Sequence, residues 1–479
     1  MTLSDFDTWY RVRYHRTSSA IIAIAFIFSD LFAVMLSFGA GFFAVNLYDF
    51  AIINFKSFVT YWLYVPVFLL IFQVCNLYPG VSLAPSEEFK LFTTASFMAH
   101  GGIILSRFIE DRELDAISVA FAVSFVFSTF MLLMCRSATH YLLRKKRLGG
   151  IPAVVYGGEA LGKLVVDRLL DSVKTGYVPV LILSEKLEAD AYREVPVLHD
   201  ISLGPELVRR YNIKMAIVAM QELNEEELTR LLNHSVSAFR YNALIPDFFR
   251  ATNIWMTVRD FDGLLGFLTS HRLKMGWNLA MKRFMDLSLT IIGGVLILPL
   301  LLLLALVVKV SSPGPVLYGH GRLGCNGKPF KAYKFRSMAI DADARLRKLL
   351  EEHPAMREEW EASHKIKNDP RVTKVGRFLR RTSLDELPQL INVLKGEMSL
   401  VGPRPIVEDE VPKYGEDFKR IFSVKPGISG LWQVSGRSDT DYNERVLFDT
   451  YYLQSWSVWL DMWILYQTII AVLRGRGAY

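Results

Sequence analysis

The sequence is poor in cysteine. Its 479 residues include only three cysteines, Cys75, Cys135 and Cys325, and no two of them form a Cys-x-x-Cys pair. This spacing excludes a disulfide framework and a zinc knuckle, which need closely grouped cysteines. A chain without disulfides fits a reducing, cytoplasmic environment. No cleavage pattern of a signal peptide follows the first apolar run, so we expect that run to be retained.

Long apolar runs exclude a purely soluble or disordered chain. The mean hydropathy is +0.24 and 51% of the residues are apolar. Four apolar runs lie before residue 140, at residues 21–47, 59–77, 91–105 and 117–135. A helix needs about 20 apolar residues to cross a bilayer, and His100 makes the third run marginal. The runs predict four transmembrane helices in residues 1–148.

Basic residues are scarce in the loops between these runs but frequent at both ends of the region. They are Arg11, Arg13 and Arg16 before the first run, and Arg144, Lys145, Lys146 and Arg147 after the fourth. Loops rich in lysine and arginine stay in the cytoplasm. We therefore expect both ends of this region to be cytoplasmic, which requires an even number of crossings.

Residues 149–271 alternate short apolar runs with amphipathic stretches, which predicts a parallel α/β sheet of Rossmann-like type. The loop Gly157–Gly162 resembles a dinucleotide fingerprint but lacks the G-x-G-x-x-G spacing, so nucleotide binding and scaffolding both stay open. A membrane-tethered sugar-nucleotide epimerase would need a Tyr-x-x-x-Lys pair after this loop. The one such pair, Tyr141 and Lys145, precedes the first strand, so this alternative lacks its catalytic base.

Acidic residues are scarce in residues 272–383, where 21 basic residues face 9 acidic ones. The net charge of this segment is +12, whereas residues 1–150, 151–271 and 384–479 carry +2, −4 and −3. The basic excess is therefore local. It indicates one region that binds anions or, alternatively, a solvated face beside a membrane.

A fifth apolar run, Leu287–Val308, has 22 residues without a charge and contains Pro299. Basic residues flank it on both sides, and proline bends a helix because it removes a hydrogen bond. A re-entrant helix at about 284–309 and a kinked true span both fit the residues. Residues 451–473 hold Trp456, Trp459 and Trp463, which predicts an interfacial helix or, equally, a helix buried in its own domain.

Asp385 and Glu386 form a carboxylate pair that follows five basic residues in positions 371–381. Neighbouring side chains point in different directions, so one carboxylate can attack phosphorus while the other holds Mg²⁺. The alternative is a plain helix N-terminus with Ser383 as its N-cap. Further cations stand on a predicted strand at 329–338, in a proline-flanked loop and in a glycine-rich stretch. They are Lys334, Arg336, Arg404, Lys425 and Arg437.

Four sequence blocks carry a resemblance to a known family. They are Lys334–Met338, Thr382–Gln389, Lys395–Pro405 and Lys425–Gly430. Together they resemble the bacterial sugar transferases, also called monotopic phosphoglycosyl transferases, over roughly residues 280–479. The residues upstream resemble the large membrane members that start O-antigen or exopolysaccharide assembly.

The resemblance implies transfer of a sugar 1-phosphate from a UDP-sugar to undecaprenyl phosphate, with release of UMP. Galactose is the expected sugar and glucose the alternative. By position, Asp385 matches the nucleophile that forms a covalent intermediate, and Glu386 matches a Mg²⁺ ligand. The phosphate-binding positions are matched by Lys334, Arg380 and Arg404, and the further substrate-binding candidates are Arg336, Arg381, Lys425 and Arg437.

The resemblance also favours the re-entrant helix, because UDP-sugars are cytoplasmic and a true span would put the site outside. Leu298 replaces the serine of the family's Ser-Pro break before Pro299. The expected protein is a membrane protein of α and α/β type in the bacterial inner membrane. It has four transmembrane helices (1–148), a Rossmann-like domain (149–271) and a catalytic domain with re-entrant and interfacial helices (272–479).

The implied partners are the two substrates and membrane lipid, with no nucleic acid, and we expect a homodimer. A membrane scaffold for a polysaccharide assembly complex is the non-catalytic alternative.

Overall fold

The computed structural model divides into two compact units, residues 1–252 and 253–479. It describes residues 3–14, 19–47, 64–78, 84–145, 150–171, 177–220, 225–245, 256–261, 264–269, 273, 276–338, 371–435 and 442–474. Arg437 therefore lies outside the described residues.

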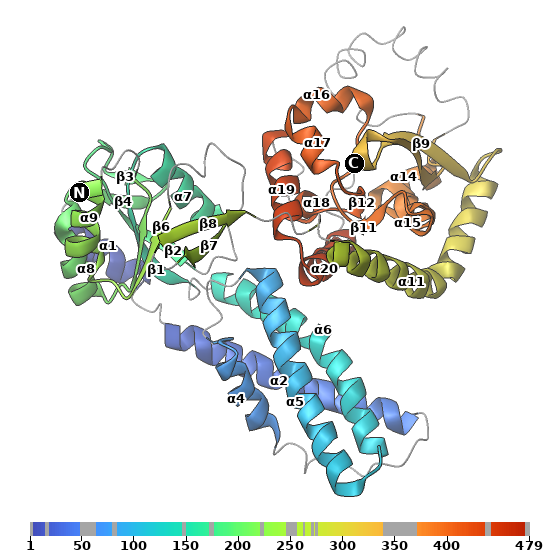
Figure 1. Cartoon of the computed structure of the whole chain (residues 1–479), viewed down its shortest axis with the longest axis horizontal. Coiled ribbons are helices and arrows are strands. Elements are labelled where there is room, and N and C mark those ends of the chain that lie inside the picture. The colour runs from blue at the N-terminus through green and yellow to red at the C-terminus, as the bar shows by residue number, and fades with distance from the viewer. Residues whose placement is uncertain are drawn as a thin grey trace. The chain divides into compact units, whose positions relative to one another are not determined.

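Helices occupy all four apolar runs of the first unit. They are α2 (Ser19–Leu47), α4 (Val65–Val74), α5 (Pro85–Asp111) and α6 (Ala116–Lys145), with α2 packed along α6 (Figure 1). Among the described residues of this unit, two stretches are long and apolar enough to cross a membrane, 20–47 in α2 and 116–143 in α6. Helix α4 has ten described residues, and α5 has two acidic residues, Glu87 and Glu88, in its first turn.

The α/β part of the same unit holds a six-stranded sheet, which confirms the predicted α/β class. The strands are β1 (Ile151–Tyr156), β2 (Tyr177–Leu183), β3 (Ala191–Tyr192), β4 (Val195–Leu198), β5 (Met215–Val218) and β6 (Tyr241–Leu244). Their order is β3-β4-β2-β1-β5-β6, and all neighbours are parallel except β3 and β4. The helical segments are α7 (Ala160–Asp171), η2 (Ile201–Leu203), α8 (Gly204–Tyr211), α9 (Glu225–Arg230) and η3 (Leu231–Val236).

The N-terminal helix α1 (Leu3–Tyr14) packs on this sheet domain, although more than 130 residues separate them. Phe6 and Tyr10 are buried against Tyr211, with ring centroids 5.1 and 5.2 Å apart. Helix α1 precedes the bundle and the sheet follows it. If the bundle crosses a membrane, this contact requires an even number of crossings, in agreement with the charge pattern.

The second unit contains short strands and helices around one long helix. It starts with the hairpin β7 (Met256–Phe261) and β8 (Leu264–Thr269), then α11 (Gly276–Ser311) and the hairpin β9 (Leu317–Leu323) and β10 (Pro329–Phe335). The short 3₁₀ helix η5 (Cys325–Gly327) joins β9 to β10. The elements that follow are α14 (Lys374–Arg381), η6 (Leu384–Gln389), α15 (Leu390–Lys395), β11 (Ser399–Val401), η7 (Glu408–Glu410), α16 (Val411–Tyr414), α17 (Asp417–Ile421), β12 (Gly427–Ser429), α18 (Leu431–Val434), α19 (Tyr442–Ser455) and α20 (Val458–Arg474).

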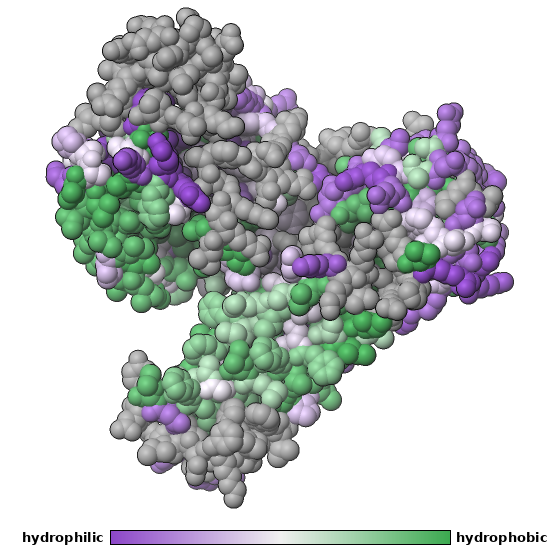
Figure 2. Space-filling view, turned by 180° about the vertical axis from the view of Figure 1, so that it is seen from behind, coloured by the Kyte–Doolittle hydropathy of each residue, from purple (hydrophilic) through white to green (hydrophobic). Residues whose placement is uncertain are grey.

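Helix α11 bends sharply partway along its length (Figure 1). It contains Pro299, which cannot donate a backbone hydrogen bond and clashes with the preceding turn. Figure 2 shows hydrophobic side chains gathered over this helix, and Val295 and Leu296 are 67% and 76% exposed. A bent helix with an uncovered apolar surface is suited to entering lipid and returning.

Helix α20 is part of the core of this unit. Trp456, just before α20, and Trp463 within it are buried together with Leu460 and Ile464. The spacing of Trp456 and Trp463 therefore reflects packing inside the domain, which favours the second of the two alternatives, a helix buried in its own domain. Spacing alone marks one helix face but does not say whether lipid or protein covers it.

Candidate active site

The carboxylate pair lies on the 3₁₀ helix η6. Ser383, directly before it, has a left-handed backbone with φ of +56°, and its side chain forms no capping hydrogen bond. Ser383 therefore occupies the N-cap position, with Asp385 and Glu386 in the first turn as the alternative expected, but its side chain does not cap the helix. Asp385 is buried and Glu386 is half-buried, so the two carboxylates have different surroundings.

Strand β10 brings the first cation to this pair. Lys334 Nζ donates a hydrogen bond to Glu386 Oε1 at 2.5 Å. The strand predicted at 329–338 is confirmed for Pro329–Phe335, so Lys334 lies within it. Regular strand geometry fixes the direction of Lys334, because side chains alternate between the two faces.

The environment shifts the pKa values of the two carboxyls in opposite directions. Burial raises the pKa of Asp385, and the adjacent Glu386 raises it further, against the opposing effect of Lys334 and Arg380. Burial also acts to raise the pKa of Glu386, but Lys334, Arg404 and Arg322 outweigh it and lower that pKa. Carboxyl pairs with pKa values driven apart are suited to separate chemical roles.

Three arginines complete the charged cluster. Arg380 Nε donates to Ser337 Oγ at 2.9 Å, and the Arg404 guanidinium lies 5.8 Å from the centroid of the Trp432 ring. Arg322 lies 3.7 Å from Glu410. The site thus combines Asp385 and Glu386 with Lys334, Arg322, Arg380 and Arg404.

Arg322 was missed in the sequence. It lies on β9, where it pairs with Phe330, while Lys334 pairs with Tyr318. Because side chains alternate along a strand, Arg322 and Lys334 stand on the same face of this hairpin. The signal that could have identified Arg322 is the turn at Gly324–Lys328. This turn sets the register in which β9 pairs with β10, and the register places Arg322 on the face of Lys334.

The other predicted cations lie elsewhere. Arg336 Nη2 donates to the carbonyl and hydroxyl oxygens of Ser312 at 2.7 and 2.8 Å. Its Nε and Nη1 atoms are buried and form no hydrogen bond within the described chain. Arg381 is exposed on α14. Burial and the neighbouring Arg283 lower the pKa of Lys425, whereas Asp286 acts to raise it. Because Arg283 and Asp286 both belong to α11, Lys425 lies near the start of that helix.

The donor set suits a magnesium ion bound together with substrate. In the part of the chain that the structure describes, no three His, Cys, Asp or Glu residues are grouped closely enough to hold a metal ion alone. Mg²⁺ in phosphate sites commonly takes one or two carboxylates plus phosphate oxygens and water. Glu386 could provide one such carboxylate, which leaves Asp385 for a separate role.

Protein atoms surround the glycine-rich loop of the sheet domain. A Cβ on Gly158 would lie 2.6 Å from Leu187 Cβ and 2.7 Å from Ser184 Oγ. Beside it, Lys186 Nζ pairs with Glu159 Oε1 at 2.8 Å. Packing against Ser184 and Leu187 therefore accounts for the glycine at position 158 without a ligand.

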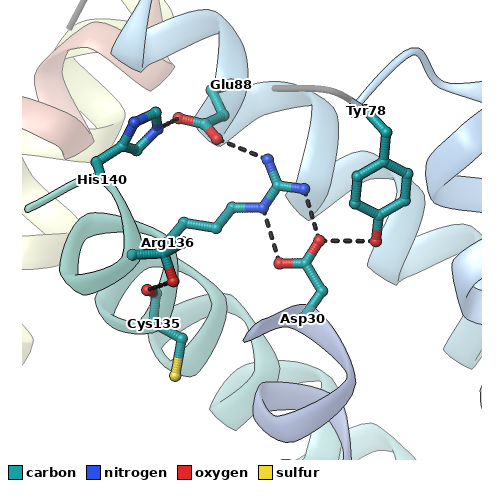
Figure 3. Close-up of polar contacts among 7 residues, drawn as sticks. Asp30, Tyr78, Glu88, Cys135, Arg136 and His140 are labelled. Atoms are coloured by element: carbon teal, nitrogen blue, oxygen red, sulfur yellow. Dashed lines mark hydrogen bonds and ion pairs between the residues drawn. The ribbon is translucent and has the colours of Figure 1, made fainter. Parts of the chain in front are cut away.

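A second charged cluster, also missed in the sequence, lies inside the helical bundle (Figure 3). Arg136 donates to Asp30 from Nε at 2.9 Å and from Nη2 at 2.6 Å. Its Nη1 donates to Glu88 Oε1 at 2.6 Å, and Tyr78 donates to Asp30 at 2.8 Å. His140 Nε2 lies 3.5 Å from Glu88. Charged residues within otherwise apolar helices were the available signal.

The second unit is similar to proteins of a known family. A family model described as bacterial sugar transferase matches residues 277–475. A Haemophilus influenzae protein described as an uncharacterized sugar transferase is 42% identical over 327 residues, 66% of this chain and 67% of that protein.

Two further relatives have more specific names. A Salmonella typhimurium protein named undecaprenyl-phosphate galactose phosphotransferase is 38% identical over 364 residues, 73% of this chain and 75% of that protein. An Escherichia coli protein named UDP-glucose:undecaprenyl-phosphate glucose-1-phosphate transferase is 38% identical over 270 residues, 55% of each chain. The Salmonella alignment is longer than the second unit, so the similarity extends into the first.

Proposed function

The chain belongs to the bacterial sugar transferase family, and from this we propose that it transfers a hexose 1-phosphate from a UDP-sugar to undecaprenyl phosphate. Such a transfer belongs to bacterial polysaccharide biosynthesis. The observation that supports it most directly is the buried Asp385 beside Glu386, with Lys334, Arg322, Arg380 and Arg404 around them.

We propose that Asp385 is the nucleophile in two balanced steps. Its carboxylate oxygen attacks the phosphorus that bears the sugar, the bond from this phosphorus to the bridging oxygen breaks, and UMP leaves with the electron pair. An oxygen of undecaprenyl phosphate then attacks the same phosphorus. The bond to Asp385 breaks, the carboxylate is restored, and the lipid carries a diphosphate-linked sugar. Carboxylates are established nucleophiles toward phosphorus.

The cations support this chemistry by opposing the negative charge of the phosphates. Phosphoryl transfer depends mainly on positioning and on electrostatic stabilisation of the phosphoryl oxygens. Lys334 acts electrostatically on both carboxylates, Arg404 and Arg322 act on Glu386, and Arg380 acts on Asp385. Glu386 would hold a magnesium ion together with substrate phosphates, and the ion would supply further positive charge to the diphosphate.

The bent, apolar α11 supports a site at a membrane surface. One substrate is a lipid phosphate and the other is a water-soluble nucleotide, so the site must be accessible to both. A re-entrant α11 in the inner membrane would leave residues on both sides of it in the cytoplasm, where UDP-sugars occur. We propose this arrangement, with the active site on the cytoplasmic face.

The sugar is proposed to be galactose. Of the named relatives above, the Salmonella protein gives the longest alignment, and its name specifies galactose. Glucose is the alternative, on the name of the Escherichia coli protein.

The test is UMP release by the purified full chain in lipid nanodiscs. With a UDP-hexose labelled in the sugar, label should stay on the protein without acceptor lipid and leave it when undecaprenyl phosphate is added. Magnesium removal should stop both steps. A panel of UDP-galactose and UDP-glucose identifies the sugar. Absence of UMP release with every UDP-hexose would favour the scaffold alternative.

A further inference from the structure

The first turns of α11 carry three charged side chains, Lys282, Arg283 and Asp286, on a helix that is otherwise mostly apolar. All three bond to other elements of the second unit. Two of them, Lys282 and Asp286, are buried. The proposed function gives them no role, so we asked what these contacts hold in place.

Arg283 contacts the end of the helix that continues from the carboxylate pair. Its Nη1 donates to the carbonyl oxygen of Val393 at 2.6 Å, and its Nη2 donates to that of Leu394 at 3.0 Å. These carbonyls belong to the last turn of α15, which begins at the residue after η6. Arginine at a helix C-terminus satisfies free carbonyls and opposes the negative end of the helix dipole.

Gly396 lies beside this contact. It ends α15 with a left-handed backbone, φ +82°, and a Cβ added to it would lie 3.4 Å from Arg283 Nη2, an ordinary van der Waals distance. The positive φ favours glycine here, because a side chain would strain the left-handed backbone. The segment that follows the carboxylate pair is therefore fastened to α11 at its far end.

Asp286 contacts the strand that leads to Arg404. Its Oδ1 accepts a hydrogen bond from the backbone N–H of Leu400 at 3.1 Å, in the middle of β11. Arg404 follows four residues later, next to Pro403 and Pro405. Between them, the Gly402 N–H donates to the Ser429 carbonyl oxygen at 2.9 Å, and the Pro403 carbonyl oxygen accepts from the Gly427 N–H at 2.9 Å. These bonds, together with the fixed φ of proline, restrict the backbone between this contact and Arg404.

Lys282 fixes the same helix to the core. Its Nζ donates to Asp461 Oδ2 at 2.7 Å, and Tyr452 and Trp456 donate to the same carboxylate at 2.7 and 3.1 Å. Asp461 is fully buried. The base of α11 is thus a fixed point against which α15 and β11 are both held.

Resting on the function proposed above, we propose that Arg283 and Asp286 are positioning residues for the transfer. They tie α11 to two points within the segment from Asp385 to Arg404, the end of α15 and the middle of β11, so the membrane helix helps to set the distance between nucleophile and phosphate-binding arginine. A displacement of about 1 Å at a reacting centre can cost on the order of 100-fold in rate. The position of α11 in the lipid therefore affects the distances between the residues of the active site.

The experiment compares Asp286→Ala, Asp286→Asn and Thr290→Val in the full chain in nanodiscs. Asparagine keeps the Oδ1 acceptor. Thr290 is the matched control, since it is buried one turn further along α11 and its hydroxyl has no partner among the residues described. The burst of UMP release counts competent enzyme, and the following steady state gives kcat per competent enzyme.

We expect Asp286→Ala to lower kcat per competent enzyme by about 10- to 100-fold. Asp286→Asn should restore most of this rate, and Thr290→Val should stay within about twofold. A second pair, Arg283→Ala and Arg283→Lys, gives the same test should Asp286→Ala not fold. Lysine can reach one of the two carbonyls, so it should recover part of the loss.

An effect of Asp286→Ala confined to burst amplitude or melting temperature would show a purely structural role and overturn the proposal. A wild-type kcat per competent enzyme in both alanine variants would do the same. Absence of UMP release in the wild-type protein would instead refute the proposed function, so the two failures are distinguishable.

Discussion

The two charged clusters of this protein use the same residue types in opposite ways. In the bundle, all three side-chain nitrogens of Arg136 donate to carboxylates, and Asp30 accepts a further bond from Tyr78. Arg136 and Asp30 are 1% and 0% exposed. Each nitrogen of the guanidinium is thus bonded to a carboxylate inside the protein, which is the arrangement of an interhelical lock.

The active-site cluster leaves positive charge over. Lys334, Arg322, Arg380 and Arg404 surround two carboxylates. Lys334 pairs with Glu386, and Arg322 lies 3.7 Å from Glu410, so four cations face three carboxylates. Surplus cations beside buried carboxylates attract phosphates. The comparison teaches that a structural cluster differs from a binding site in how far its charged groups are paired with one another. The mere presence of charged groups does not separate the two.

The largest effect is expected at the nucleophile. Asp385→Asn should lower UMP release by at least about 1,000-fold, because the amide oxygen is a far weaker nucleophile than the carboxylate. Sugar label should no longer stay on the protein. Asp409→Asn, at an exposed carboxylate on η7, is the control and should keep full activity. Full turnover in Asp385→Asn would refute the assignment.

Arg136→Leu should instead affect stability. It leaves the buried Asp30 and the partly buried Glu88 without their cation, and the loss of one partner of a buried pair typically costs about 3–5 kcal/mol. The free energy of unfolding in mixed micelles measures the loss, and kcat per competent enzyme should not change. The variant Asp30→Asn/Arg136→Leu should recover part of the stability. If Arg136→Leu lowered kcat and left unfolding unchanged, the bundle cluster would not be a lock.

Arg404→Leu should lower kcat/KM by about 100-fold with little effect on unfolding, since charged contacts to transferring phosphates act in the transition state. Arg377→Leu removes an exposed arginine from α14 and serves as the control. Equal losses in the two variants would mean that general surface charge, rather than a placed cation, attracts the substrates.

The smallest effect is a shift in pH dependence. Burial holds the pKa of Asp385 above its ordinary value, and Lys334 acts to lower it. The attacking form is the carboxylate, so the rate of the UMP burst should fall as pH drops through this pKa. Lys334→Met removes a lowering influence, which raises the pKa and moves the acid limb to higher pH. If the acid limb of this pH profile stayed in place or moved to lower pH in Lys334→Met, Lys334 would not lie close enough to Asp385 to affect its pKa.

Local chemistry made much of the fold predictable. The helices of the apolar runs, the α/β alternation after residue 150 and the strand that carries Lys334 follow from hydrophobic period and from backbone preferences within a few residues. The carboxylate pair was also visible, because Asp385 and Glu386 are adjacent in sequence and follow a dense basic stretch. Pro299 predicted a bend that α11 shows.

By itself, then, the sequence determined which segments form helices and strands, where apolar surface is concentrated and which residues can carry the chemistry. Only the tertiary structure decided which residues distant in the sequence contact one another. It joined Asp30 to Arg136 across 106 positions, brought Arg322 to Glu386, bonded Arg336 to Ser312 and buried Trp456 and Trp463 in a core. The physical reason is that period and propensity act over a few neighbouring residues, whereas pairing and burial depend on which distant elements pack together.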